Sequence, residues 1–102
     1  MNLFWYQKNV LPVIIEYKNI CDREGVGKIV STATAVYRKS ANCSDVFDLV
    51  EEAIGVRPIL LSGQQEAELA PLSYLTLNKN YRGWILFIDQ GRGSTELSLV
   101  SP

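Results

Sequence analysis

Histidine is absent from this 102-residue chain, and cysteine occurs only at positions 21 and 43. The two cysteines do not form a C-x-x-C pair, so the sequence argues against a zinc site. The lack of histidine argues against catalysis by an imidazole base or nucleophile. We interpret Cys21 and Cys43 as free thiols and therefore predict a reducing, cytoplasmic location.

An excess of charge of either sign is also missing, because ten basic and eleven acidic side chains leave a net charge of -1. This balance gives no electrostatic case for binding nucleic acid or an anionic membrane, so any phosphate site must be local.

Long apolar runs are lacking too. Residues 7–9 and Glu16 interrupt the apolar N-terminal stretch, which predicts neither a signal peptide nor a membrane span. The length predicts a single domain over residues 1–102.

What the chain does contain is an alternation of helical and strand patterns. Helices are expected over 12–24, from Asn42 to Gly55, and from Ser62 or Gly63 onward, with Pro71 bending or shortening the last one. Strands are expected over 28–35, 56–61, 84–89 and 95–100. This order predicts an α/β fold with a largely parallel sheet covered by helices.

Polar residues gather where three of the expected strands end, in the clusters 33–38, 62–66 and 89–94. In sheets of this kind, ligands usually lie beyond the carboxyl ends of the strands, so we expect the three clusters to converge. The last cluster belongs to the hairpin IDQGRGSTELSLV, residues 88–100. Its glycines suffice for a turn, and its other polar groups are surplus to folding, which indicates either a phosphate-holding nest or a polar hairpin without a ligand.

Three segments in order carry a resemblance to a known family: ATAVYRKSAN (33–42), LSGQQEAEL (61–69) and IDQGRGSTEL (88–97). Together they resemble the exopolyphosphatase and guanosine pentaphosphate phosphatase (Ppx/GppA) family, over about residues 20–101. The resemblance implies a ribonuclease H-like α/β domain of the actin-like ATPase superfamily, here incomplete, with a mixed sheet flanked by helices. It also implies magnesium-dependent hydrolysis of the terminal phosphoryl group of polyphosphate or guanosine pentaphosphate.

The same resemblance implies roles for individual residues. Glu66 matches the acid that activates water, and Arg38 matches an arginine suited to a bidentate phosphate contact. Asp89 and Glu96 match acids of the glycine loop and are expected to hold Mg²⁺. The expected phosphate-binding residues are Gly91, Arg92, Gly93 and Ser94.

Each of these residues also has an ordinary structural interpretation. Glu66 suits the first turn of a helix, where the helix dipole favours an acid. Arg38 and Lys39 suit a solvated basic pair after a strand, and Glu96 suits the surface of a hairpin.

The chain also departs from the family pattern. Gln90 replaces an apolar residue, Arg92 a glycine and Glu68 an arginine, while Pro71 interrupts the helix that carries Glu66. An arginine at position 92 would be strained if the loop required a positive φ there.

The family's opening D-x-G-S-N-S loop and the second half of its fold have no counterpart in the 102 residues. We therefore interpret the chain as a piece of a phosphatase, of weak or no activity by itself. The alternative is a non-catalytic module that binds a phosphorylated ligand or a protein. We also expect a homo-oligomer in which residues 3–6 (LFWY) take part, because these side chains have no evident partner within the chain.

Overall fold

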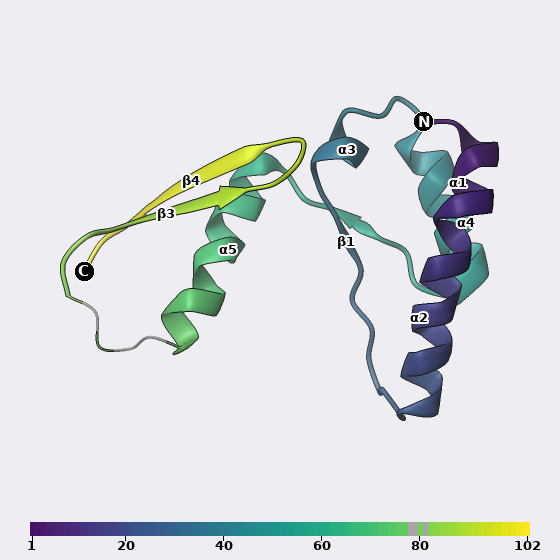
Figure 1. Ribbon diagram of the computed structural model, residues 1–102, viewed down its shortest axis with the longest axis horizontal. Coiled ribbons are helices and arrows are strands. Elements are labelled where there is room, and N and C mark those ends of the chain that lie inside the picture. The colour runs from purple at the N-terminus through teal and green to yellow at the C-terminus, as the bar shows by residue number, and fades with distance from the viewer. Residues whose placement is uncertain (78–79, 81) are drawn as a thin grey trace. The chain divides into compact units, whose positions relative to one another are not determined.

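The computed structural model describes residues 1–77, 80 and 82–102. The chain forms two compact units: the first contains residues 1–33 and 37–60, and the second contains residues 34–36 and 61–102 (Figure 1). Among the described residues, none of the helices has the length and apolar character needed to cross a bilayer.

Three helices build the core of the first unit: α1 (Leu3–Asn9), α2 (Leu11–Arg23) and α4 (Cys43–Ile54). Helix α2 has a proline in its first turn, where a missing N–H costs nothing, and is followed by Gly25 with a φ of 70°. Helix α4 ends at Gly55, whose left-handed conformation lets its N–H donate to the Glu51 carbonyl at 2.8 Å. Both predicted helices are confirmed to within a residue or two.

Residues 3–6 form part of α1, with Tyr6 in the core and Phe4 and Trp5 exposed, and their part in a homo-oligomer stays a prediction. Asn2 caps α1 by accepting a hydrogen bond from the Trp5 N–H at 2.9 Å. Tyr6 is buried and packs with Val46 and Val50 of α4. Its hydroxyl lies 3.2 Å from that of Tyr37, and burial, followed by this hydrogen bond, raises the pKa of the Tyr6 phenol. Tyr6 is thus not available for contacts between chains.

Asn42 stands at the N-cap position of α4, as predicted, but its side chain does not cap the helix. Its Oδ1 accepts hydrogen bonds from the N-terminal ammonium group at 2.9 Å and from Ser40 Oγ at 2.7 Å. The side chain therefore ties the chain start to the loop before α4.

Strand pairing in the first unit is shorter than the sequence predicts. Strands β1 (Thr32–Ala33) and β2 (Ile59–Leu60) pair in parallel, with Thr32 opposite Ile59. The patterns at 28–35 and 56–61 predict longer strands, but in the described residues each of these strands has a single neighbour. A second correction is that the described strands form two separate two-stranded sheets rather than one mixed sheet.

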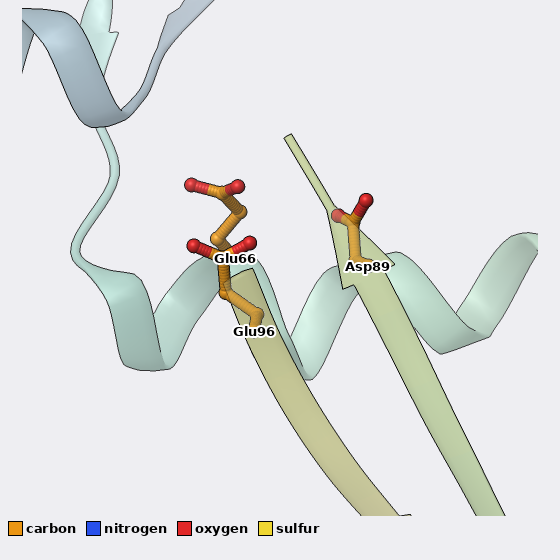
Figure 2. A group of neighbouring side chains, drawn as sticks. All are labelled: Glu66, Asp89 and Glu96. Carbon is orange, nitrogen blue, oxygen red and sulfur yellow. The ribbon is translucent and has the colours of Figure 1, made fainter. Parts of the chain in front are cut away.

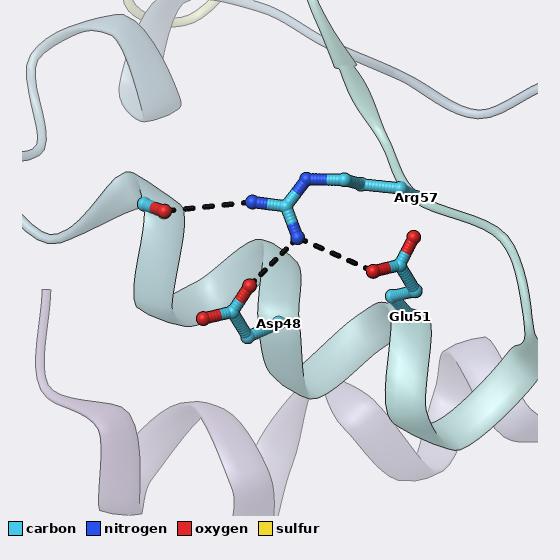
Figure 3. A network of polar contacts seen from close by, with 4 residues as sticks. Asp48, Glu51 and Arg57 are labelled. Carbon is cyan, nitrogen blue, oxygen red and sulfur yellow. Dashed lines mark hydrogen bonds and ion pairs between the residues drawn. The ribbon is translucent and has the colours of Figure 1, made fainter.

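An arginine joins the segment before β2 to α4 (Figure 3). Arg57 Nη1 donates to Asp48 Oδ1 at 2.7 Å and lies 3.5 Å from Glu51 Oε1. Its guanidinium carbon is also 5.9 Å from the centre of the Phe47 ring, within the range of a cation–π contact. These contacts fix the entry of the chain into β2.

The second unit packs one helix against a hairpin (Figure 1): α5 (Gly63–Leu77), β3 (Ile85–Gln90) and β4 (Thr95–Val100). Ser62 and Gln65 form a capping box, because Ser62 Oγ accepts from the Gln65 N–H at 3.0 Å and Gln65 Oε1 accepts from the Ser62 N–H at 2.9 Å. The strands are antiparallel, with Asp89 opposite Glu96. The predicted hairpin is therefore confirmed.

Pro71 does not shorten α5, which continues to Leu77. A proline lacks the N–H that would bond to the carbonyl four residues earlier, which here belongs to Ala67. Ser98 Oγ of β4 donates a hydrogen bond to this Ala67 carbonyl instead. A strand side chain thus replaces the missing helical hydrogen bond and fixes α5 to the hairpin.

Candidate functional site

The site in the second unit begins with the alternation of side chains along the hairpin. Along β3 and β4, every second residue is sheltered, and the residues between them are exposed. Asp89 and Glu96 are both on the sheltered side, directly opposite each other in the strand register. Glu66 comes from the first turn of α5, where its N–H donates to the Ser62 carbonyl at 2.9 Å.

These three acids meet in space (Figure 2). Glu66 projects from α5, Asp89 from β3 and Glu96 from β4, and one carboxylate oxygen of each lies within 4.8 Å of the others. Glu66 and Asp89 are half-buried, whereas Glu96 is only 7% exposed. The burial of Glu96 argues against its interpretation as a hairpin surface residue.

The electrostatics of this cluster favour a cation. Asp89 and Glu96, directly opposite each other in an antiparallel pair, repel, and the half-buried Glu66 adds to the repulsion. Ser94 Oγ offsets part of the cost by donating to Glu96 Oε1 at 2.7 Å. Sequence reasoning missed this contact, although Ser94 and Glu96 are two residues apart along one edge of the hairpin and such residues share a face.

The donor set fits magnesium. It consists of carboxylate oxygens alone, which Mg²⁺ and Ca²⁺ prefer, and it contains no thiolate or imidazole. Oxygens bound to one Mg²⁺ ion lie no more than about 4.2 Å apart, so the observed spacing requires only a small inward movement of the side chains.

A cavity of about 380 Å³ lies beside the acids in the second unit. Its lining comes from all three of the polar clusters that the sequence predicts to converge. The lining residues are Thr34, Ala35, Val36, Glu66, Gly91, Arg92, Gly93 and Ser94. Glu66 therefore belongs both to the cavity wall and to the acid cluster, and Arg92 places a positive charge at the same cavity.

The hairpin turn differs from the predicted phosphate loop in its backbone. Gly91 and Gly93 do not have positive φ angles, and the Gly91 N–H donates to the Ser94 carbonyl at 2.9 Å. That N–H closes the hairpin, and the phosphate-binding role of Gly91, Arg92, Gly93 and Ser94 stays a prediction. No non-glycine residue in the described part of the chain has a positive φ, and Arg92 is thus unstrained.

Arg38, the other residue predicted to act in catalysis, is the last residue of α3 (Ala35–Arg38) and belongs to the first compact unit. Its role in phosphate binding stays a prediction. Cys21 and Cys43 are both free thiols.

The family model of the Ppx/GppA phosphatase family matches residues 7–102, nearly the whole chain. The chain belongs to this family. Exopolyphosphatase 1 of Mycobacterium leprae is 31% identical over 93 residues, which are 87% of this chain and 26% of that protein. Exopolyphosphatase 1 of Mycobacterium tuberculosis shows the same identity and coverage.

Solved structures of the family share the fold. A crystal structure of the Aquifex aeolicus Ppx/GppA family member matches with a TM-score of 0.78 and 26% identity, over 92% of this chain and 30% of that chain. A second structure of the A. aeolicus enzyme matches with a TM-score of 0.73 and 27% identity, over 92% and 31% of the two chains. This member of the Ppx/GppA family spans about a quarter of the length of the mycobacterial exopolyphosphatases that it matches.

Proposed function

We propose that this chain carries part of the site of a phosphoanhydride hydrolase that acts on the terminal phosphoryl group of polyphosphate or guanosine pentaphosphate. The observation that carries the proposal is the meeting of Glu66, Asp89 and Glu96 beside a cavity that Arg92 also lines. Membership of a family that includes exopolyphosphatases supports the same substrate class.

Each residue of the site has a separate task in this proposal. Glu66 accepts a proton from the attacking water or orients it, because its carboxylate lies at the wall of the cavity. Asp89 and Glu96 would hold Mg²⁺. Bound there, the ion would neutralise charge that develops on the phosphoryl oxygens.

The phosphate itself would contact Arg92, Gly93 and Ser94 in the cavity. A guanidinium offers two parallel donors to a phosphate, and this supports Arg92 as the main anion contact. Gly91 contributes its small size rather than its N–H, which the hairpin uses. The resemblance of the first motif assigns Arg38 a further phosphate contact.

The test is calorimetric binding of Mg²⁺ and of pyrophosphate to the 102-residue chain, with Asp89→Asn and Glu96→Gln as variants. We expect both variants to lose Mg²⁺ binding. Glu68→Gln serves as the control, because Glu68 is an exposed acid of α5 outside the cluster. Equal Mg²⁺ binding by Asp89→Asn and the parent chain would refute the assignment.

Activity is a separate expectation. The chain spans about a quarter of its exopolyphosphatase relatives. Because positioning supplies most of the acceleration in phosphoryl transfer, we expect little or no phosphate release from polyphosphate or guanosine pentaphosphate. Turnover near 1 s⁻¹, about the lower end of normal enzyme rates, would contradict this expectation.

The second candidate is a module that binds a phosphorylated ligand or a protein without catalysis. Retained Mg²⁺ and pyrophosphate binding by an inactive chain would support a ligand-binding module. Activity that requires Glu66 would favour the hydrolase.

A further inference from the structure

Ser94 lies immediately before β4 and is held by hydrogen bonds of both its main chain and its side chain. Its carbonyl accepts from the Gly91 N–H at 2.9 Å. Its Oγ donates to Glu96 Oε1 at 2.7 Å, a short distance that is typical of a hydroxyl bonded to a charged carboxylate. Ser94 and Glu96 are two residues apart, so their side chains lie on the same, sheltered face of the hairpin.

The Ser94 hydroxyl has one proton, so it can donate only one hydrogen bond at a time. In this structure Glu96 receives that bond. Ser94 also lines the cavity, where a bound phosphate would compete for the same proton. Glu96 is only 7% exposed, so little water could replace the hydroxyl if the phosphate took it. This competition favours the carboxylate over the phosphate.

We propose that Ser94 is a positioning residue of the cation site, whose hydroxyl orients the Glu96 carboxylate toward Mg²⁺ and donates no hydrogen bond to phosphate. This rests on the proposed function, because it requires Glu96 to be a metal ligand. A glutamate side chain has three rotatable bonds, and Asp89, directly opposite, repels Glu96. The bond from Ser94 keeps Glu96 in the orientation in which it meets Glu66 and Asp89 (Figure 2).

The two roles open to the Ser94 hydroxyl predict opposite results for one variant. Carboxylates that bind a metal are themselves usually hydrogen-bonded, and loss of such a partner typically weakens metal binding about 10–100-fold. If the hydroxyl positions Glu96, Ser94→Ala therefore weakens Mg²⁺ binding and leaves anion binding unchanged. If the hydroxyl is a phosphate donor, the same change weakens anion binding and leaves Mg²⁺ binding unchanged.

The experiment is calorimetric titration of the 102-residue chain with Mg²⁺ alone and, separately, with pyrophosphate in the presence of EDTA. Ser94→Ala should raise the Kd for Mg²⁺ at least tenfold, as expected for loss of a partner outside the ligand set. It should leave the Kd for pyrophosphate unchanged. Ser94→Thr keeps the hydroxyl and should retain most of the Mg²⁺ affinity.

Thr95→Val is the matched control. It removes a hydroxyl from the neighbouring residue, which is exposed on the other face of the hairpin, and it keeps a side chain that favours strands. All titrations are made at a temperature at which circular dichroism shows each variant to be folded. A purely structural role of Ser94 would lower the midpoint of thermal unfolding without changing the Kd for Mg²⁺ of the folded chain. If Ser94→Ala does not fold, Ser94→Cys takes its place, because a thiol is similar in size but only a weak donor.

The Mg²⁺ titration decides the matter. A parent chain that binds Mg²⁺ with the same Kd as Ser94→Ala would overturn the positioning role alone and leave the proposed function intact. A parent chain that binds no Mg²⁺ would overturn both. Equal weakening by Ser94→Ala and a folded Ser94→Thr would also overturn the positioning role, because the hydroxyl would then not be the group that matters.

Discussion

Replacing Ser98 with alanine should destabilise the second unit because it removes the donor that stands in for the missing N–H of Pro71. The Ser98 hydroxyl bonds to the Ala67 carbonyl, which a proline at position 71 cannot reach. A net hydrogen bond contributes about 0.5–1.5 kcal/mol, and a carbonyl left without a donor costs about 1–3 kcal/mol. Since the site is only half-buried, we expect a loss of about 1–2 kcal/mol.

A double-mutant cycle with Pro71→Ala tests the cause of this loss. Alanine at 71 restores the backbone N–H, so Ser98→Ala in that background should cost about 0.5 kcal/mol or less. The expected coupling energy between the two positions is then about 1 kcal/mol, well above the roughly 0.3–0.5 kcal/mol by which independent sites deviate from additivity.

The assay is urea unfolding followed by Trp84 fluorescence. Trp5 is the other tryptophan of the chain, so a Trp5→Phe background makes the signal report on the second unit alone. Ser73→Ala is the control, because Ser73 Oγ donates to Ala70 O within α5, and a regular helix already supplies that carbonyl with a backbone donor. Equal costs of Ser98→Ala with proline and with alanine at 71 would refute the reasoning.

Three further predictions concern the acids and the turn. Glu96→Gln should stabilise the Mg²⁺-free chain by about 1 kcal/mol by relieving repulsion, and unfolding that shows no gain would contradict the electrostatic argument. Gly93→Val should abolish pyrophosphate binding while Gly93→Ala retains it, because a Cβ at 93 would lie 3.5 Å from the Ala35 Cβ and only the branches of valine would enter the cavity. Arg92→Gly should weaken pyrophosphate binding several-fold in calorimetry, since the turn places no positive φ on Arg92. Tighter binding would mean that the arginine obstructs the site.

The elements that the sequence predicts well are those whose signals are local. One such signal is the apolar stripe of α4, which ends at Gly55, and another is the glycine turn between β3 and β4. Each signal spans about a dozen residues, and both elements form as expected. The segment 28–35 has strand residues throughout, yet only Thr32 and Ala33 pair, because a ladder also needs a neighbour that sequence patterns cannot supply.

The site shows the same division. The convergence of three polar clusters follows from the order of strands and helices, and the cavity lining confirms it. The direction of the Gly91 N–H depends on how the hairpin closes, and glycine at that position is compatible with several turn geometries. The hydrogen bond between Ser98 and Ala67 joins residues 31 positions apart, so no local sequence pattern predicts it.

Pro71 also sets the alignment of α5 on the hairpin. Most carbonyls within an α-helix are already bonded, so a hydroxyl on a neighbouring strand gains little by choosing one over another. Pro71 leaves the Ala67 carbonyl without a helical donor, and the Ser98 hydroxyl donates to it. If α5 shifted by one helical turn along β4, the Ala67 carbonyl would lose its donor. The Ser98 hydroxyl would then face a carbonyl that already accepts a backbone hydrogen bond. Pro71 thus selects one register of α5 against β4. Because Glu66 immediately precedes Ala67, this register also holds Glu66 beside Asp89 and Glu96.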